Sequence, residues 1–159
     1  MYYFSEFVNM SFQDAVGATR EALKCRDFKV LAEIDLAEVL KMYLPVGSRP
    51  YAILATCNPR LAHRAIRADA EIGSIVFCNF VVHQCPDGRV EISAADPAAT
   101  IGTINDVELM GVARELRSMV QHVIKDVASR PAPRSALGHR KQADRQLARM
   151  LPKPRVARL

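Results

Sequence analysis

The stretch from Tyr51 to Ile66, YAILATCNPRLAHRAI, decides the fold of this chain. Its first part is apolar and predicts a buried strand that ends at Cys57. Asn58 is a favourable helix N-cap residue and Pro59 suits the first helical position, so a helix is predicted to begin directly after the strand. Cys57 is therefore expected at the carboxyl end of a strand, beside the positive end of a helix.

The rest of the sequence predicts further strands and helices around this unit. Strands are expected over residues 2–8, 28–34, 77–84 and 89–94, and helices over residues 12–26, 35–44, 59–70 and 105–128. Pro86-Asp87-Gly88 predicts a hairpin turn, because proline presets φ and glycine supplies a positive φ. This order predicts an α+β fold, an α/β two-layer sandwich in which helices pack on a mixed or antiparallel sheet and a long helix ends the domain.

Three local details belong to this prediction. Strict alternation in the second strand places four side chains on one face: Phe28, Val30, Ala32 and Ile34. Asn105, with Glu108 three residues further on, is expected to cap the longest helix. Gly73 is expected to end the helix that begins at Pro59.

The basic charge is concentrated at the C-terminal end. Residues 1–129 hold 13 Lys or Arg against 16 Asp or Glu, whereas residues 130–159 hold nine Lys or Arg and one acid. We therefore predict a single α/β domain over residues 1–128 and a basic, proline-containing tail over residues 129–159 that is disordered or partly helical. A solvated tail is favoured over a tail that binds nucleic acid or an anionic surface, because it lacks aromatic side chains for base stacking.

The sequence also indicates a compartment. Its N-terminal residues have neither the basic segment nor the apolar run of a signal peptide, and the longest nearly apolar run, residues 75–82, is too short to cross a bilayer. No Cys-x-x-Cys pair occurs among the four cysteines, Cys25, Cys57, Cys78 and Cys85. We expect a cytoplasmic protein with reduced thiols and no transmembrane segment.

Six stretches resemble the family catalogued as domain of unknown function 302: FQDAV (12–16), FKVLAEID (28–35), PYAIL (50–54), CNP (57–59), CNFVV (78–82) and ADP (95–97). Together they span the predicted domain and none of the tail. The resemblance implies a compact α/β domain that forms a homodimer, and it supplies no established activity.

The same resemblance marks certain positions as fitting the family pattern: Glu33 and Asp35, Cys57-Asn58-Pro59, and Cys78-Asn79. One position departs from it. Phe77 stands where the family usually has proline, which affects the expected backbone geometry beside Cys78.

Cys57 is the first candidate for chemistry. A thiol beside a helix N-terminus is expected to have a lowered pKa, and Arg60 in the first turn would add positive potential. Such a thiolate could be a nucleophile, a sulfur carrier or a soft-metal ligand. The alternative is that a small residue is needed where the strand meets the helix.

Four further residues join this hypothesis, each with a structural alternative. Cys78 could form a redox pair or a soft-metal site with Cys57, but alternation also suits a core position. Glu33 and Asp35 could act as a general base or bind a cation; the alternative is that Asp35 caps a helix and Glu33 is a solvated surface residue. Asn58 could present its amide to a ligand, although capping alone explains it.

His83 and Cys85 lie two residues apart on one face of a predicted strand, a spacing seen in metal sites. They also adjoin the hairpin turn, where exposed polar residues are common. No Cys-x-x-Cys or His-x-x-x-His supports them, so the sequence assigns no metal ligands.

No hydrolase, zinc-protease or P-loop motif occurs in the chain, and no cofactor can be named. The preferred hypothesis is a homodimeric binding or accessory module for a small anion or metal at the Cys57-Asn58-Pro59 helix start. Its candidate ligand-binding residues are Asn58, Arg60, Glu33 and Asp35. The alternative is a thiol-based redox enzyme or sulfur carrier that uses Cys57 with Cys78 as catalytic residues.

Overall fold

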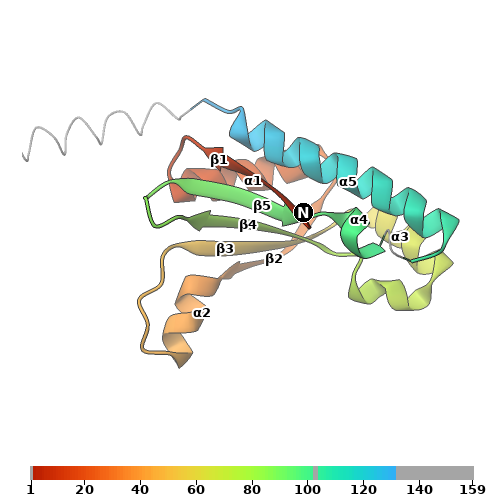
Figure 1. Cartoon of the computed structure of the whole chain (residues 1–159), viewed down its shortest axis with the longest axis horizontal. Helices are drawn as coiled ribbons and strands as arrows, with labels where there is room; N and C mark the ends of the chain where they lie inside the picture. The colour runs from red at the N-terminus through yellow and green to blue at the C-terminus, as the bar shows by residue number, and fades with distance from the viewer. Residues whose placement is uncertain (1, 102–103, 132–159) are drawn as a thin grey trace, which may run out of the picture.

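A computed structural model describes residues 2–101 and 104–131 of the chain. Within them, five strands form one antiparallel sheet in the order β1-β5-β4-β3-β2 (Figure 1). The strands are β1 (Tyr3–Val8), β2 (Lys29–Asp35), β3 (Tyr51–Cys57), β4 (Cys78–Gln84) and β5 (Val90–Ala95). The helices are α1 (Phe12–Cys25), α2 (Leu36–Tyr43), α3 (Pro59–Ala68), the 3-10 helix η1 (Ala70–Ser74), α4 (Pro97–Thr100) and α5 (Val107–Ala128). The predicted α+β fold is confirmed, with an antiparallel sheet.

Local capping chemistry explains where the helices begin. Ser11, Asp35 and Asn58 each accept a hydrogen bond from a backbone N–H in the first turn, which satisfies a group that the helix leaves unpaired. The longest helix is capped by Asp106, one residue later than expected, because the Asp106 carboxylate accepts from the Leu109 N–H at 2.8 Å. Within the described residues, no helix combines the length and the hydropathy needed to cross a membrane.

Two other local predictions are wrong. The alternation expected in β2 is interrupted by a register shift between Val30 and Ala32. Val30 packs against the core, whereas Ala32 pairs with Ala55 on the opposite face of the sheet, since one extra residue reverses the direction of the side chains that follow. Gly73 does not end α3; it lies inside η1, which follows Asp69.

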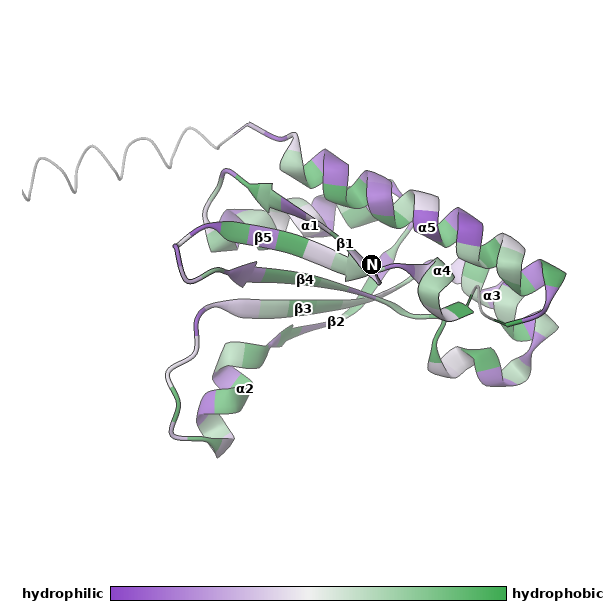
Figure 2. Cartoon of the chain, in the orientation of Figure 1, coloured by the Kyte–Doolittle hydropathy of each residue, from purple (hydrophilic) through white to green (hydrophobic). Residues whose placement is uncertain are grey.

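Helices cover one face of the sheet, and the core lies between them. Helices α1 and α5 contact the sheet and each other, and α3 packs against α5. Figure 2 shows polar and apolar segments alternating along α5, as expected for a helix with one buried face. The core includes large fully buried side chains from both layers, such as Leu54, Phe80, Ile92 and Leu116.

The opposite face of the sheet carries half-buried and exposed side chains, and we call it the open face. Alternation along the strands places there, among other side chains, Tyr3, Phe7, Tyr51, Ile53, Asn79, Val81, His83, Glu91 and Ser93. Helix α2 projects from the end of β2, away from the other helices (Figure 1). The tail predicted over residues 129–159 lies outside the described residues from residue 132 onward.

Candidate functional site on the open face of the sheet

The helix start at Asn58 is closely packed, and its polar groups have partners within the fold. Asn58 is 3% exposed; its Oδ1 accepts from the Leu61 N–H at 3.1 Å, and its Nδ2 lies 3.9 Å from the Met119 sulfur. The Arg60 guanidinium pairs with Glu115 of α5 at 3.0 Å. The Asn58 amide and the Arg60 guanidinium, which the sequence suggested as ligand-binding groups, therefore contact side chains of α5 and help to pack α3 against it.

A second arginine strengthens this docking. Arg64 forms ion pairs with Glu108, at 2.8 Å, and with Glu115. Hydrogen bonds from Arg64 first, and then from Arg60, hold the pKa of Glu115 below its ordinary value. The positive charge at the start of α3 is therefore offset by acidic side chains of α5.

Cys57 and Cys78 lie in neighbouring strands, but the pleat directs them differently. Cys78 is directly opposite Thr56 in the β3–β4 register and is 9% exposed, whereas Cys57 is one residue further along β3 and half-buried. Burial raises the pKa of the Cys57 thiol, the reverse of the shift expected from the helix terminus. Burial, and to a lesser degree the charge of Cys57, raises the pKa of Cys78 to about 12.

The other two candidate ligands lie elsewhere. Glu33 pairs with Arg20 of α1 at 2.7 Å, and the Asp35 carboxylate accepts from the Glu38 N–H at 3.0 Å to cap α2. In the β2–β3 register Asp35 is opposite Ala52. Cys57 lies five residues further along β3, a separation of about 17 Å. The sequence-predicted site residues are therefore spread along β2 and β3, the start of α3 and the first residue of β4, and do not meet at one point.

The sheet instead brings together three other side chains, at the hairpin between β4 and β5. His83 is directly opposite Glu91, and Cys85 lies two residues beyond His83 on the same face. The His83 Nε2 lies 3.5 Å from the Glu91 Oε2, and the Cys85 sulfur lies 3.7 Å from that nitrogen and 3.9 Å from that oxygen. We call these three residues the hairpin triad.

The hairpin triad is positioned by the turn. Gly88 has a φ of 86°, as the sequence predicted, and the Cys85 N–H donates to the Arg89 carbonyl at 2.8 Å. This closes the hairpin and fixes the register in which His83 meets Glu91. Burial, and then the nearby Glu91 and Asp87 carboxylates, raise the pKa of the Cys85 thiol.

The environment of His83 differs on its two ring nitrogens. Its Nε2 faces the other two members of the hairpin triad. Its Nδ1 is buried and has no hydrogen-bond partner among the described residues. The ring itself packs against Tyr51, with the centroids 5.5 Å apart.

A depression of about 450 Å³ on the open face begins at His83 and Glu91. It runs along β4 and β5 away from the hairpin, and we call it the sheet depression. Its lining comprises Tyr2, Tyr3, Asn79, Val81, His83, Glu91, Ser93, Ala94 and Ala95. The side chains of Asn79 and Ser93 have no hydrogen-bond partner among the described residues. Aromatic, amide and hydroxyl groups therefore face the same hollow as two members of the hairpin triad.

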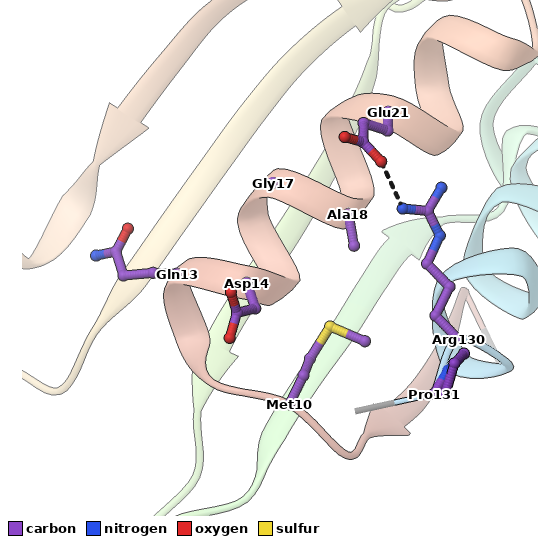
Figure 3. Close-up of a pocket in the computed structure, with 8 residues that line it drawn as sticks. All are labelled: Met10, Gln13, Asp14, Gly17, Ala18, Glu21, Arg130 and Pro131. Atoms are coloured by element: carbon purple, nitrogen blue, oxygen red, sulfur yellow. Dashed lines mark hydrogen bonds and ion pairs between the residues drawn. The ribbon is translucent and has the colours of Figure 1, made fainter. Parts of the chain in front are cut away.

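A second depression, of about 380 Å³, lies against α1 (Figure 3). Its acidic groups already have partners, because Asp14 accepts from the Ser11 hydroxyl at 2.7 Å and Glu21 pairs with Arg130 at 2.8 Å. Figure 3 shows the Arg130–Glu21 pair bridging the end of α5 to α1 above Met10. This hollow presents no comparable group of converging donor atoms among its described lining residues.

Comparison with known proteins agrees with this fold. The family model described as "Domain of unknown function DUF302" matches residues 4–127. The chain belongs to this family. A solved structure of another DUF302 member, an uncharacterized conserved protein from Bacillus stearothermophilus, superposes with a TM-score of 0.75 at 25% identity. The match covers 80% of this chain and 98% of that one. No curated protein sequence matches the chain.

Sequence reasoning on this DUF302 chain singled out His83 and Cys85 but not Glu91. The signal that could have found Glu91 was the hairpin itself. Once Pro86-Asp87-Gly88 is accepted as the turn, counting back from it along both strands places residue 91 opposite residue 83. The family resemblance gave no help, because its six stretches include none of the three triad residues.

Proposed function

We propose that this domain is a binding module for a thiophilic divalent metal ion, held by His83, Cys85 and Glu91. The observation that carries the proposal is the separation of their donor atoms, 3.5, 3.7 and 3.9 Å. Tetrahedral Zn²⁺, with bonds of about 2.3 Å to sulfur and about 2.0–2.1 Å to nitrogen and oxygen, places its ligand atoms about 3.3–3.6 Å apart. Shifts of a few tenths of an ångström would seat the ion.

The chemistry of the three donors supports the same ion. A thiolate and an imidazole favour zinc and copper over magnesium and calcium, which prefer oxygen ligands. The Cys85 thiolate and the Glu91 carboxylate together carry two negative charges, which balance a divalent cation. Arg89 is close enough for its charge to act on the Cys85 thiol, but its Nε donates to Asp87 at 2.7 Å, so that carboxylate partly offsets its charge.

The same geometry supports binding over thiol catalysis. In a Cys-His-carboxylate nucleophile system, the carboxylate holds the imidazole nitrogen that faces away from the sulfur. Here Glu91 and Cys85 both face the Nε2 of His83, and Nδ1 has no partner among the described residues. Three donors around one point suit a shared cation. The alternative of a thiol enzyme built on Cys57 and Cys78 is less favoured, because burial raises the pKa of both thiols.

The surroundings of His83 Nδ1 limit the metal affinity that we expect for the hairpin triad. A metal-bound imidazole usually donates its other N–H to an acceptor, and losing that acceptor lowers metal affinity about 10–100-fold. No described residue offers His83 Nδ1 such an acceptor. We therefore expect binding that is weaker, by about that factor, than in a zinc site with a complete set of hydrogen bonds.

Titration of the reduced full chain with Co²⁺ tests the proposal. We expect one equivalent to bind and to produce a thiolate-to-cobalt charge-transfer band with the visible bands of a tetrahedral ion. Cys85→Ser should abolish the charge-transfer band, and His83→Gln and Glu91→Gln should each weaken binding. Cys25→Ser, at an exposed cysteine of α1, is the matched control and should leave the spectrum unchanged. A band that survives Cys85→Ser, or is lost with Cys25→Ser, would overturn the assignment.

The homodimer implied by the family resemblance is the second part of the proposal, and α2 is its proposed contact. Ala37 is the only buried residue of this eight-residue helix. Three apolar residues at its end are well exposed: Met42 (70%), Tyr43 (80%) and Leu44 (49%). A helix this short is marginal without tertiary packing, so a second copy of the chain is the partner we propose for this surface.

Sedimentation analysis tests the dimer. We expect the wild-type chain to sediment as a dimer and Tyr43→Lys as a monomer. Val107→Lys replaces another exposed apolar residue, 84% exposed at the start of α5, and should remain dimeric. A monomeric wild-type chain would contradict this part of the proposal and leave the metal site untouched.

A further inference from the structure

The hairpin triad and the sheet depression share two residues, and this overlap carries a further inference that rests on the proposed metal site. His83 and Glu91 both line the depression, whereas Cys85 does not. Cys85 lies on the hairpin side of the triad, and the depression lies on the other side. In an ion held by the three side chains, the Cys85 sulfur would therefore occupy the side that faces the turn. The opposite side of the ion would face the sheet depression.

Three protein ligands leave a four-coordinate ion with one position to fill. Structural zinc sites are closed by a fourth protein side chain, whereas sites with three protein ligands bind water or another small molecule at the fourth position. Among the described residues, no fourth His, Cys, Asp or Glu ligand atom joins this triad. The open position is thus available to a molecule lying in the depression.

The strand register sets the length of that molecule. The His83–Glu91 pair is followed by the Val81–Ser93 pair, and Tyr3 pairs with Ala95 further along. Asn79 lies four positions before His83 in β4, which corresponds to about 13 Å along the strand. With a volume of about 450 Å³, the hollow fits a small molecule rather than a folded partner.

The lining determines the charge of that molecule. Among the described residues, Glu91 is the only charged side chain that lines the depression, and no lysine or arginine does so. Because Cys85 and Glu91 already balance a divalent cation, the loaded site has no surplus positive charge to attract an anion. Arg89 does not line the depression: its guanidinium is 3.8 Å from the centroid of Phe7, the residue opposite Glu91 in β1, and is paired with Asp87, which offsets its charge.

The remaining side chains that line the depression favour a ligand that is flat and carries polar groups at its edges. Tyr2 and Tyr3 provide adjacent aromatic rings, with centroids 5.0 Å apart. Asn79 and Ser93 provide an amide and a hydroxyl without partners among the described residues. We propose that the fourth coordination position faces the sheet depression and takes the nitrogen donor of an uncharged, planar heteroaromatic molecule, with the tyrosine rings against its body and Asn79 and Ser93 at its polar edges.

The test uses the full chain loaded with Co²⁺, with imidazole as the uncharged heteroaromatic ligand and acetate as the anionic one. At a mildly alkaline pH, at which imidazole is uncharged, we expect imidazole to shift the visible bands saturably and acetate at equal concentration to leave them unchanged. The thiolate-to-cobalt band should persist throughout, since Cys85 stays bound.

A matched pair of variants ties the effect to the depression. Val81→Trp fills the hollow beside the triad without changing a proposed metal ligand, and it should weaken imidazole binding about tenfold or more while Co²⁺ still binds. Ala32→Trp adds the same ring to the open face at the sheet edge and should leave imidazole binding unchanged.

The outcomes separate the two proposals. Absence of Co²⁺ binding would overturn the metal site itself. Co²⁺ binding without any imidazole shift would overturn only the open position. An equal response to acetate would overturn the uncharged ligand, and an imidazole affinity unaffected by Val81→Trp would show that the fourth position faces away from the depression.

Discussion

Cys57 and Cys85 lie toward opposite ends of the β3–β4 strand pair and differ in what surrounds them. Cys57 precedes a clear helix start, is half-buried and packs against the core, and the arginine three residues further on, Arg60, is paired with Glu115. Cys85 follows a strand that ends in a turn, and the fold places an imidazole and a carboxylate within 3.9 Å of its sulfur. A helix cap needs only neighbours in sequence, whereas a cation site needs donor atoms that the sheet register brings from two strands.

The largest expected difference between the two cysteines is the protection of their thiols by a bound metal. If Zn²⁺ is held at about a hundred times its Kd, the metal-free fraction falls about a hundredfold, and alkylation of Cys85 should slow by the same factor. Alkylation of Cys57 should not change. Peptide mass spectrometry after timed labelling gives both rates in one sample, and protection of Cys57 in place of Cys85 would reverse our assignment.

A second prediction concerns Cys78, the buried partner proposed for Cys57. Its folded-state pKa of about 12 lies above that of an unfolded thiol, so the unfolded chain loses this proton first as the pH rises. The contribution of the protonated Cys78 thiol to the free energy of unfolding is fully present below the pKa of the unfolded thiol, about 8.5. Above it, this contribution decreases by about 1.4 kcal/mol per pH unit until the pH reaches the folded-state pKa.

Chemical denaturation of wild type and Cys78→Ala across the alkaline range measures this slope. The slope should be steeper in the wild type by about 1.4 kcal/mol per pH unit, and the difference between the two proteins at neutral pH reports packing alone. Equal slopes would show that Cys78 ionises in the folded protein and would restore it as a candidate for thiol chemistry.

A third prediction sharpens the view that the helix start is structural. Asn58→Ala removes the cap of α3 at a buried position and should lower the free energy of unfolding by about 1 kcal/mol. Co²⁺ affinity at the hairpin triad should be unchanged. Paired denaturation and cobalt titrations separate the two effects, and a loss of metal binding in Asn58→Ala would link the two regions.

The smallest effect is expected where α3 meets α5. Arg64 and Arg60 lower the pKa of Glu115, so their stabilisation is present at neutral pH and is lost as the pH falls through the folded-state pKa of this carboxylate. Because the Glu115 side chain is 41% exposed, solvent screens these pairs, and Glu115→Gln should lower stability by less than about 1 kcal/mol. Acid denaturation curves of the two proteins should converge at low pH.

Much of the fold could be predicted from local pattern. The Tyr51–Cys57 strand, the Asn58 cap and the Gly88 turn follow from residue types that have few alternative conformations. The predictions that were wrong depended on tertiary context. The register shift between Val30 and Ala32 reverses the faces of the side chains that follow, although the sequence pattern predicts regular alternation. The cap of α5 is Asp106 and not Asn105, because either residue type can cap a helix.

The candidate site was predicted less well for the same reason. Cys57, Asn58 and Arg60 were singled out because they are adjacent in sequence, but a local motif does not reveal that Glu115 lies against Arg60. His83 and Cys85 were recognised as a spacing without a third ligand. The proposed third ligand, Glu91, comes from the next strand, and it is recognised only when the hairpin register of β4 with β5 is taken into account.

The sequence by itself determined the elements of this DUF302 domain, because hydrophobic periodicity, capping residues and turn residues act over a few neighbouring positions. The tertiary structure alone decided which face of the sheet stays open and which donor atoms meet there. Those outcomes depend on strand register and on the packing of α1, α3 and α5, which bring together residues far apart along the chain.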